Sequence, residues 1–433
     1  MANTKHFGFW TLLFLVVANM VGAGVFTTSG FTLRDLGSPH LVVAAWAIAG
    51  LIATAGAVGY GQLARWLPES GGEYLFLSRA AHPLLGFVAG WVSLIAGFSG
   101  AIAYAARALE SYLAPVADRP DWLPSGGVAV LAIVAAGLFH GWRPRLGAAL
   151  QNGVVALKLL LLAAFLSYAA TQATGHTWHA QPLVVAPSSA WQTAAALAGS
   201  LVWISLSYSG FNAAVYIAGE ARDARRNVPG AMVCATVLVA MLYVLLNAVF
   251  VYAAPAEAIA GQDDVAAVAA RWLGGAGFAR FVRVCICAAL LTSVLSMMLA
   301  APRVYAKMAD DGWLPGVLRI TGQAPTAAVA TQVTIAAALV LLYETLEGLL
   351  AYLSLTLSLS AACSVACLFL PSVRRLPLWH PALWLPAFYV VSTLFVGLAL
   401  IANDWLQAVG TVVTFAAGAA LYFACSRVKR KGD

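Results

Sequence analysis

The chain has 433 residues, of which 62% are hydrophobic and only 9% charged, and its mean hydropathy is +0.86. Soluble domains carry about 25% charged residues, so this composition excludes a water-soluble enzyme or binding module and indicates an integral membrane protein. The net charge of +7 is spread over short loops rather than gathered on one exposed domain, which argues against nucleic-acid binding.

Apolar stretches long enough to cross a bilayer recur along the whole chain. No soluble domain can be cut out between them, so we expect residues 1–433 to form a single transmembrane domain. The first stretch is too long for a cleavable signal peptide. Windows of about twenty residues predict twelve spans, and counts of eleven or thirteen stay open because two connections are very short. The predicted spans are residues 8–34, 41–64, 84–113, 125–141, 147–171, 190–219, 229–254, 279–308, 325–343, 346–370, 381–402 and 404–426.

The distribution of Lys and Arg between the predicted loops gives an orientation. With the N-terminus in the cytoplasm, 17 of the 24 basic residues lie inside, six lie outside and one lies within a span. This excess predicts that both chain ends are cytoplasmic, because positively charged loops stay inside. The six residues expected outside are Arg34, Arg107, Arg119, Arg271, Arg280 and Arg283.

The first predicted span is interrupted near its middle by NMVGAGVFTTSG, residues 19–30, which holds three glycines and a cluster of hydroxyl groups. An unpaired backbone group costs several kcal/mol in lipid, so an unwound stretch survives only where protein buries it or where it lines a cavity. Gly22 and Gly24 would let the backbone leave helical geometry and let a ligand approach closely. A packing face of small residues explains the same glycines, so this segment alone leaves both interpretations open.

A single charge interrupts the fifth predicted span. Lys158 lies about eleven residues into that span, within QNGVVALKLLLLAAF. Ionisable side chains at such depth are costly and usually functional, and Lys158 is too central for its ammonium to extend easily to either interface. The sequence therefore predicts a functional role for Lys158 rather than snorkelling.

The sixth predicted span again places Ser, Gly and Asn at membrane depth, in SLSYSGFNAAVYIAGE, residues 205–220. Two interrupted spans, five apart, are typical of inverted-repeat transporters that bind their substrate at the midplane. The ends of the half-helices would offer N–H groups to an anion and carbonyl groups to a cation. A zwitterion fits such a pair of breaks.

Other chemistry is poorly represented in the sequence. No nucleophile–base pattern, phosphate-binding loop or metal-ligand spacing is present, so we expect no enzyme, no metal site and no cofactor. All six cysteines fall inside predicted spans and are interpreted as small apolar core residues. They are Cys234, Cys285, Cys287, Cys363, Cys367 and Cys425.

Four segments in order resemble the amino acid–polyamine–organocation (APC) permeases, and the resemblance covers essentially the whole chain. NMVGAGVF is similar to the Gly-x-Gly break of that family's first helix, and LPESGGEYLFLSRAAHPLLGFVAGW, residues 67–91, resembles its cytoplasmic loop into the third span. YSGFNAAVYIAGEARDARRNVPGA, residues 208–231, resembles its sixth span and following loop, and APRVYAKMADDGWLP, residues 301–315, resembles the end of its eighth. In character the chain is most similar to the LAT-like and bacterial amino acid exchangers.

The resemblance implies an all-α membrane protein of the LeuT type. Spans one to five and six to ten would form inverted repeats at residues 8–171 and 190–370, with the first and sixth helices broken. Two additional C-terminal helices, within residues 381–426, would lie outside that core.

The resemblance also implies a substrate site made largely of backbone groups. The substrate carboxylate would meet the first break, and its amino group would meet carbonyls at the ends of the first and sixth half-helices. Carboxylate contacts map to Gly22, Ala23 and Gly24, and carbonyl contacts map to Met20, Val21, Leu206, Ser207, Tyr208 and Ser209. The expected gate or side-chain pocket residues are Trp203, Leu206 and Tyr208.

Two positions depart from patterns found in the family. Relatives that handle arginine or polyamines carry an acidic residue just after the break glycine, whereas this chain has Asn212 after Gly210. Met297 stands where some members present a tryptophan to the substrate, which suggests a flexible apolar wall. No predicted pocket segment contains a carboxylate, so a buried cationic substrate would be unpaired, and we expect neutral substrates.

Lys158 matches a fifth-span lysine found in part of the family. The resemblance implies that its ammonium approaches the first break and the hydroxyls of Thr292 and Ser293, in the place of a sodium ion in sodium-coupled relatives. It would be either a fixed internal cation in an exchanger or a proton carrier in a symporter. Sodium coupling is disfavoured in both cases.

These features together predict a secondary active transporter of neutral L-amino acids in the cytoplasmic membrane, working by exchange or proton symport through alternating access. The alternative from another class is a non-transporting amino acid sensor, although the tails are only a few residues long. The alternatives among transporters are a cationic amino acid or polyamine antiporter and an amino acid exporter. The loop SYLAPVADRPDWLPS, residues 111–125, contains no cysteine, so no disulfide-linked accessory subunit is expected, and a homodimer stays open.

Overall fold

The computed structural model describes residues 7–114, 120–142, 144–172, 174–183, 189–319, 326–374, 376–403 and 405–432. Every regular element in these ranges is a helix, and the only β contact there is an isolated bridge between Phe7 and Ala221. Eight helices of the described residues are long and apolar enough to cross a membrane, or nine when one bent pair counts as a single span. The protein is therefore a multi-pass membrane protein.

The other three predicted spans coincide with helices that have shorter apolar portions. These are α7 (Gly127–Trp142), α8 (Pro144–Thr171) and α13 (Thr326–Leu342). The count of twelve spans and the inverted-repeat arrangement stay predictions.

The break expected in the first span is present. Helix α1 (Phe9–Met20) ends just before the glycines, and α2 (Gly24–Leu36) continues at an angle of 43° to it. No side chain caps the start of α2, and Gly37 ends that helix with a φ of +68°, a conformation that glycine adopts without strain.

The segment before the third span differs from the prediction. After α3 (Pro39–Trp66) the chain forms a short helix, α4 (Gly72–Ala80), where only a cytoplasmic loop was expected. The third span then comprises α5 (Pro83–Val92), the π-helix η1 (Ser93–Gly100) and α6 (Ala101–Leu113). The wide π turns lie in the middle of this span, where single-turn insertions often mark functional sites.

The sixth span is interrupted as well. Helix α9 (Ala190–Tyr208) begins with a capping box between Ser189 and Gln192. Gly210 follows the helix with a φ of +93°, and the chain continues as a 3-10 helix, η3 (Ala213–Glu220). Helix α10 (Ala224–Tyr252) then runs back across the molecule.

The eighth predicted span, 279–308, is too short. Helix α12 runs from Val265 to Asp310, with non-helical backbone at Gly274 and Gly275. The prediction missed its first part because the glycines and arginines there lower the hydropathy. The remaining elements are α11 (Ala256–Ile259), η4 (Gly316–Leu318), α14 (Leu346–Ala366), η5 (Cys367–Phe369), η6 (Pro381–Leu383), α15 (Trp384–Asn403) and α16 (Leu406–Gly432).

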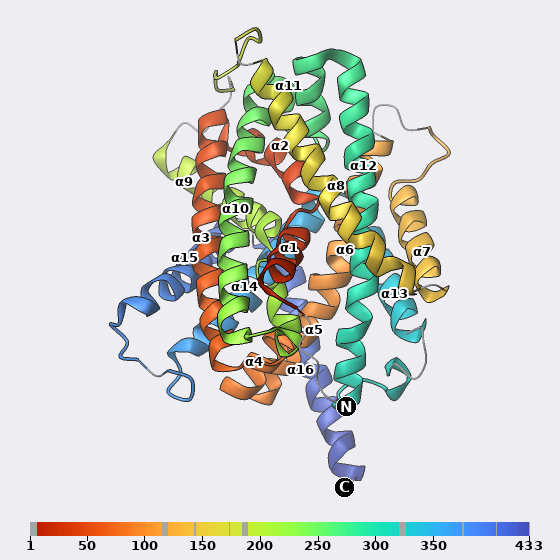
Figure 1. The fold of residues 1–433 in the computed structure, drawn as a ribbon, viewed down its shortest axis with the longest axis vertical. Helices are drawn as coiled ribbons and strands as arrows, with labels where there is room; N and C mark the ends of the chain where they lie inside the picture. The colour runs from red at the N-terminus through yellow and green to blue at the C-terminus, as the bar shows by residue number, and fades with distance from the viewer. Residues whose placement is uncertain are drawn as a thin grey trace.

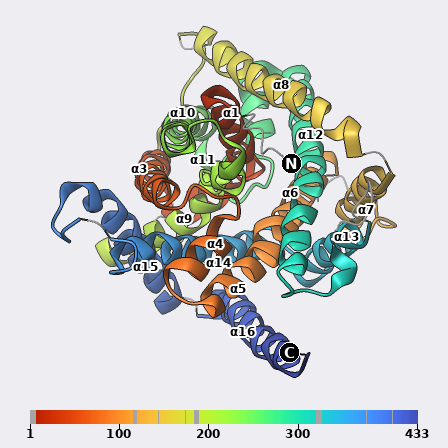
Figure 2. The same cartoon turned by 60° about the horizontal axis from the view of Figure 1, so that its bottom comes forward.

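The helices form two groups around a shared centre. Helices α1, α3 and α10 pack together on one side, and α7, α8, α12 and α13 lie on the other (Figure 1). Helices α4, α5 and α14 lie between the groups when the lower end is turned toward the viewer, and α15 and α16 lie at the periphery (Figure 2). This arrangement places the breaks of both interrupted spans in the interior.

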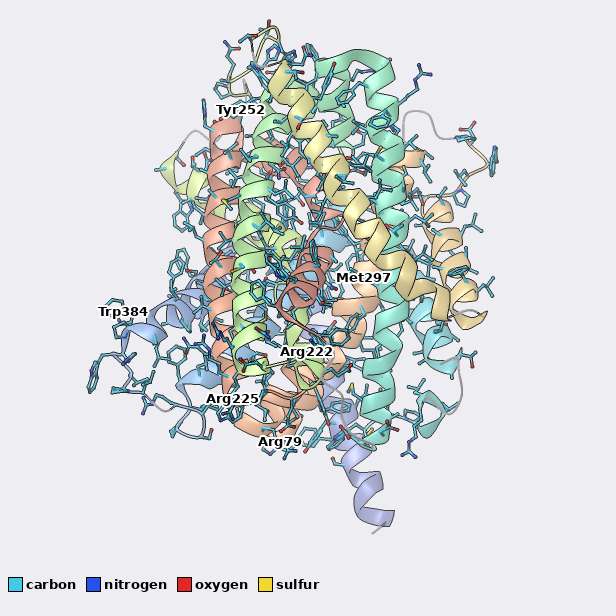
Figure 3. All side chains as sticks on the ribbon, viewed as in Figure 1. Arg79, Arg222, Arg225, Tyr252, Met297 and Trp384 are labelled. Carbon is cyan, nitrogen blue, oxygen red and sulfur yellow. The ribbon has the colours of Figure 1, made fainter. Side chains whose placement is uncertain are left out.

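One end of the molecule carries basic side chains close to both ends of the described chain. Arg79, Arg222 and Arg225 lie at the lower end, opposite Tyr252 (Figure 3). The start of the chain lies there too, because the N–H of Phe7 donates to Glu220 and its carbonyl accepts from Arg222. Helix α16 also ends on this side (Figure 1).

Candidate functional site

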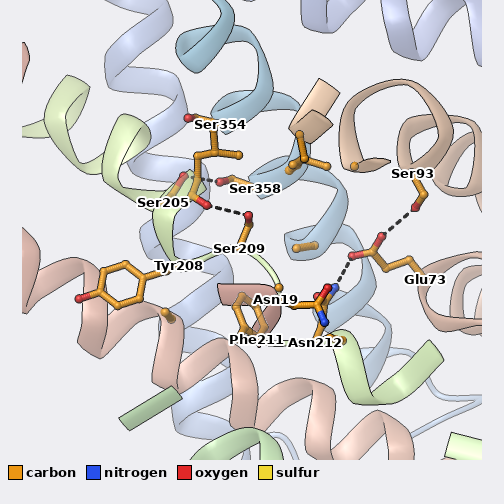
Figure 4. Close-up of a pocket in the computed structure, with 18 of the residues that line it drawn as sticks. Asn19, Glu73, Ser93, Ser205, Tyr208, Ser209, Phe211, Asn212, Ser354 and Ser358 are labelled. Carbon is orange, nitrogen blue, oxygen red and sulfur yellow. Dashed lines mark hydrogen bonds between the residues drawn. The ribbon is translucent and has the colours of Figure 1, made fainter. Parts of the chain in front are cut away.

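A cavity of about 530 Å³ lies between the two interrupted spans (Figure 4). Its walls combine apolar side chains with hydroxyl, amide and carboxylate groups from several parts of the fold, as expected of a small-molecule site. The lining includes Asn19 and Val21 at the first break, residues 205–206 and 208–213 at the second, Glu73 and Tyr74 of α4, Ser93 and Gly97 of η1, Ser293 and Met297 of α12, Ser354 and Ser358 of α14, and Tyr389 and Thr393 of α15.

Two glycines allow the interrupted spans to touch. A Cβ on Gly24 would overlap the Oγ of Ser207 and lie 3.0 Å from the Ser207 Cα. A Cβ on Gly210 would lie 2.8 Å from the carbonyl oxygen of Asn19, and its φ of +93° is strained for any other residue. The start of α2 therefore packs on the end of α9, and the end of α1 packs on the turn that follows α9.

The backbone at these breaks carries opposite partial charges. The first N–H groups of a helix have no intrahelical partner, and α2 begins here with no capping side chain, so its start presents a positive dipole end. Two of the expected carbonyls already have protein partners. The Met20 carbonyl accepts from the Tyr243 hydroxyl at 2.6 Å, and the Leu206 carbonyl accepts from the N–H and the hydroxyl of Ser209, at 3.0 and 2.6 Å.

Nine of the sixteen residues expected in the site line the cavity. They are Val21, Lys158, Leu206, Tyr208, Ser209, Gly210, Asn212, Ser293 and Met297. The residues outside its lining are Met20, Gly22, Ala23, Gly24, Trp203, Ser207 and Thr292. Trp203 is buried instead against the ring of Phe31, edge to face, and Ser207 is occupied by its packing on α2.

Lys158 is buried and has one hydrogen-bond partner among the described residues. Its Nζ donates to the Oγ of Ser293 at 2.6 Å, which joins α8 to α12. The Thr292 hydroxyl donates to the carbonyl of Ala289 on its own helix and makes no hydrogen bond with Lys158. No hydrogen bond in the described part of the chain joins Lys158 to the first break. A smaller apolar cavity of about 80 Å³ lies on the other side of Lys158, between α8, α10 and α12.

The sequence interpretation missed a carboxylate in the cavity wall. Glu73 is only 5% exposed, and its Oε1 accepts from the Tyr60 hydroxyl at 2.5 Å and from the Asn212 amide at 3.0 Å. Its Oε2 accepts from the Ser93 hydroxyl at 3.4 Å (Figure 4). The expectation of a pocket without a carboxylate is therefore wrong.

Glu73 reaches the cavity because α4 folds back under it. Gly71 and Gly72 have φ values of +145° and +56°, and a Cβ on Gly72 would overlap the ring of Tyr216. The paired glycines before an acidic residue were the available signal for this turn. Burial raises the pKa of the Glu73 carboxyl above its usual range, and the hydrogen bonds it accepts oppose that shift.

The cavity opens toward the basic end of the molecule. Ser70 and Glu220 line it there and are exposed to solvent. At the opposite end α2 is sealed against its neighbours. The Ser29 hydroxyl donates to Asn247 at 2.5 Å and accepts from Trp46, and Thr27 shares a hydrogen bond with Tyr104 at 2.6 Å.

Two further contacts hold α2 at this sealed end. Gly30 packs on Gln262, and its carbonyl accepts from the Gly261 N–H at 2.8 Å. The guanidinium of Arg34 donates to both carboxylate oxygens of Glu347, at 3.0 and 2.7 Å. Glu347 therefore ties α14 to α2.

Comparison with known proteins gives the family. The sequence model described as "Amino acid permease" matches residues 7–425. The chain is 25% identical over 322 residues to the large neutral amino acids transporter small subunit 2 of Oryctolagus cuniculus, which covers 73% of this chain and 60% of that protein. It is 27% identical over 270 residues to the b(0,+)-type amino acid transporter 1 of Mus musculus, covering 60% of this chain and 53% of that one.

The Asc-type amino acid transporter 1 of Homo sapiens is 24% identical over 328 residues, or 73% of this chain and 61% of that protein. The chain thus spans between 53% and 61% of the length of these relatives. All three are named as transporters, and none as an enzyme. A membrane-embedded helical chain with a full-length family match and two interrupted helices around one cavity belongs to the amino acid permease family of the APC superfamily.

Proposed function

We propose that this protein is a secondary transporter that carries amino acids, above all neutral L-amino acids, across a membrane by alternating access. The observation that carries the proposal is the contact of the two interrupted spans at one cavity, through Gly24 on Ser207 and Gly210 on Asn19. The uncapped start of α2 offers its dipole to a carboxylate, and the end of α9 offers carbonyl oxygens to an ammonium group. A free amino acid carries both groups.

The apolar lining of the cavity and the hydrogen bonds already made by the Glu73 carboxylate in its wall favour neutral substrates. Leu206, Phe211 and Met297 provide apolar surface for a side chain. Glu73 already accepts three hydrogen bonds from the protein, which leaves little of its carboxylate for a cationic substrate group. A cationic amino acid or polyamine antiporter is therefore the less favoured alternative, and no feature of the described residues favours a non-transporting sensor.

The end at which the cavity opens supports a particular orientation of the protein in the membrane. Its open end lies on the side of the molecule that carries Arg79, Arg222 and Arg225, and basic residues mark the cytoplasmic side of membrane proteins (Figure 3). We infer that the protein lies in the cytoplasmic membrane with both termini inside and that this conformation faces inward. We also infer that residues 8–171 and 190–370 are the two inverted repeats, with 381–426 outside them.

Uptake by proteoliposomes tests the function. The vesicles would contain a mixture of neutral L-amino acids, and labelled L-amino acids would be added outside, with protein-free vesicles and labelled D-enantiomers as controls. Accelerated uptake of a neutral L-amino acid is expected. If no labelled amino acid enters faster than in protein-free vesicles, the transport proposal is wrong and the sensor alternative replaces it.

The partner proposal needs a separate measurement. The rabbit relative is named as a small subunit, and we propose that the present chain works without a disulfide-linked partner. The loop 111–125 lies partly outside the described residues. On a non-reducing gel of native membranes, the protein should migrate at the mass of one chain, and a heavier band that reduction collapses would contradict this.

A further inference from the structure

Three carboxylates in the described part of the chain have different kinds of partners. Glu110, which is 1% exposed, accepts from the backbone N–H groups of Gly126 and Ala129, and these fixed donors suit an ionised carboxylate. Glu347 is paired with the guanidinium of Arg34. The donors to these two carboxylates are therefore backbone N–H groups in one case and a guanidinium in the other.

Glu73 has neither kind of partner. Among the described residues, no Lys, Arg or His pairs with it and no backbone N–H donates to it. Two of the groups that donate to it are the hydroxyls of Tyr60 and Ser93. A hydroxyl can either donate or accept, so these partners suit both the ionised and the protonated carboxyl group. An ionised carboxylate buried without a counter-ion is otherwise costly.

The titratable groups that face Glu73 come from four elements. They are Tyr60 of α3, Tyr216 of η3, Cys363 of α14 and Tyr389 of α15. All are uncharged near neutral pH, since phenols and thiols ordinarily ionise above it. A change of charge at this position therefore has to occur on Glu73 itself, and burial raises the pKa of this carboxyl, which favours proton uptake.

We propose that Glu73 is the proton-binding residue that couples amino acid movement to a proton gradient. When alternating access opens the cavity to the opposite side, water there delivers the proton, which bonds to Oε2 while the Ser93 hydroxyl turns to accept a hydrogen bond from it. Its release returns the proton to water at the open end, beside Ser70 and Glu220. The inference rests on the proposed transport function and, within it, assigns proton symport rather than exchange.

Asn212 connects this proton to the second break. Its amide donates to Oε1 of Glu73 at 3.0 Å, and it lies two residues after Gly210. A hydrogen bond to a charged oxygen is about twice as strong as one to a neutral oxygen. Protonation of Glu73 therefore loosens the link between α4 and the segment after α9, and ionisation tightens it.

Purified protein in liposomes tests the coupling in two modes. Counterflow is measured at equal pH, and uphill uptake is measured with the interior one pH unit more alkaline and the membrane potential clamped at zero by potassium and valinomycin. A proton symporter of one-to-one stoichiometry can then sustain an about tenfold substrate ratio. The variant Glu73→Gln keeps the shape and hydrogen bonds of a protonated carboxyl. Glu69→Gln, an exposed carboxylate of the preceding loop, is the matched control.

We expect the native protein and Glu69→Gln to accumulate substrate, while Glu73→Gln retains counterflow but reaches only equal concentrations. Titration calorimetry in two buffers of different ionisation enthalpy should also detect protons exchanged on substrate binding, and this number should fall to zero in Glu73→Gln. If the native protein shows counterflow but no pH-driven uptake, the coupling proposal is wrong and the transport proposal still holds. The same conclusion follows if Glu73→Gln accumulates substrate as well as the native protein does. Loss of substrate binding by folded Glu73→Gln would also overturn the coupling proposal, because a residue that carries only the proton is not needed for binding. Absence of native counterflow would overturn the transport proposal itself.

Discussion

Lys158 is a buried basic residue with few polar contacts. Its ammonium is buried in α8, and the Ser293 hydroxyl is its one hydrogen-bond partner among the described residues. The sequence prediction of an interior lysine near an eighth-span hydroxyl therefore corresponds to a contact between α8 and α12. The hydroxyl chosen by the geometry is Ser293, and Thr292 bonds to its own helix.

Removing the ammonium should impair transport rather than insertion. Lys158→Ala removes the hydrogen bond that the Ser293 hydroxyl accepts, although this hydroxyl still donates to the Ala289 carbonyl at 3.1 Å, and it opens space beside the cavity, at a cost of about 1 to 3 kcal/mol. We expect normal expression but a lower apparent affinity or turnover in the uptake assay, without new sodium dependence. Lys158→Arg should restore little, because a planar guanidinium does not replace a compact ammonium. Unchanged affinity and rate in Lys158→Ala would make the lysine a bystander.

The two neighbouring hydroxyls provide a matched comparison. Ser293→Ala removes the acceptor of Lys158, whereas Thr292→Ala removes only a bond within α12. Uptake rates should therefore fall more in Ser293→Ala than in Thr292→Ala. The reverse order would show that the hydrogen bond seen here is not the one that matters.

The sequence identifies a residue such as a lysine in an apolar span, because that residue type is rare there. It does not identify a residue of a common type in a polar loop that the fold brings to the cavity. A lysine within an apolar span is conspicuous because nothing else explains it. Glu73 is a common acidic residue in a polar loop, and only the folding of α4 against the cavity gives it a role. Tyr60, its closest partner, is thirteen residues away along the chain and carried no signal.

At the scale of elements, the interrupted helices depend on close contact of their backbones. The glycines at both breaks could be read from the sequence, because interrupted apolar spans are rare. The sequence does not show which of these glycines lies in close contact with the other interrupted span. A methyl group on Gly22 would meet no atom nearer than 3.9 Å, whereas Gly24 and Gly210 have no room for one.

This difference in available space predicts how strongly each Gly→Ala substitution reduces transport. Gly24→Ala and Gly210→Ala should separate the two breaks and reduce transport strongly, since each methyl meets backbone or a short side chain. Gly199→Ala, on the same helix α9, meets only a Leu400 methyl at 3.8 Å and should leave uptake near the native rate. Uptake by the three variants, normalised to the amount of inserted protein, checks the order. Equal rates in all three would mean that the close contacts are dispensable.

At the whole-molecule scale, the sealed side is held closed by two sets of contacts, one partly exposed to solvent and one buried. Arg34 and Glu347 are partly exposed, and an ion pair of this kind contributes about 0 to 1 kcal/mol. The hydrogen bonds of Ser29 with Asn247 and Trp46 are buried, so losing one leaves polar groups unsatisfied. The buried seam should therefore hold the outer side closed more firmly than the exposed pair.

Cysteine labelling can compare the two. Thr32 is fully buried on the sealed side, so Thr32→Cys, in a chain whose native cysteines are replaced, reports opening to a membrane-impermeant maleimide added outside. We expect Asn247→Ala to raise the labelling rate more than Arg34→Ala does. A larger effect of Arg34→Ala would mean that the surface ion pair, not the buried seam, controls access.

The extent of sequence-based prediction differs between the periphery and the centre of the fold. Hydropathy predicted the bounds of most long helices within a few residues, because lipid imposes the same requirement on every helix that crosses it. It missed the first part of α12, where glycines and arginines lower the hydropathy, and all of the short helix α4. The grouping of α1, α3 and α10 against α7, α8, α12 and α13 depends on side-chain packing that one sequence does not reveal.

The π-helix in the third span has a consequence for how that span can vary. A π turn takes more residues than an α turn, so the residues before and after η1 are held in an angular register that an uninterrupted α-helix would not produce. Ser93, which contacts Glu73, begins this stretch, and Tyr104 and Arg107, which contact the sealed side, follow it. Deleting one residue from 93–100 would turn the two halves by about 100° relative to each other. The helix would keep its apolar length, but its two ends could not both meet the partners named above, so the loss of a residue here requires new contacts at one end of this cavity-lining segment.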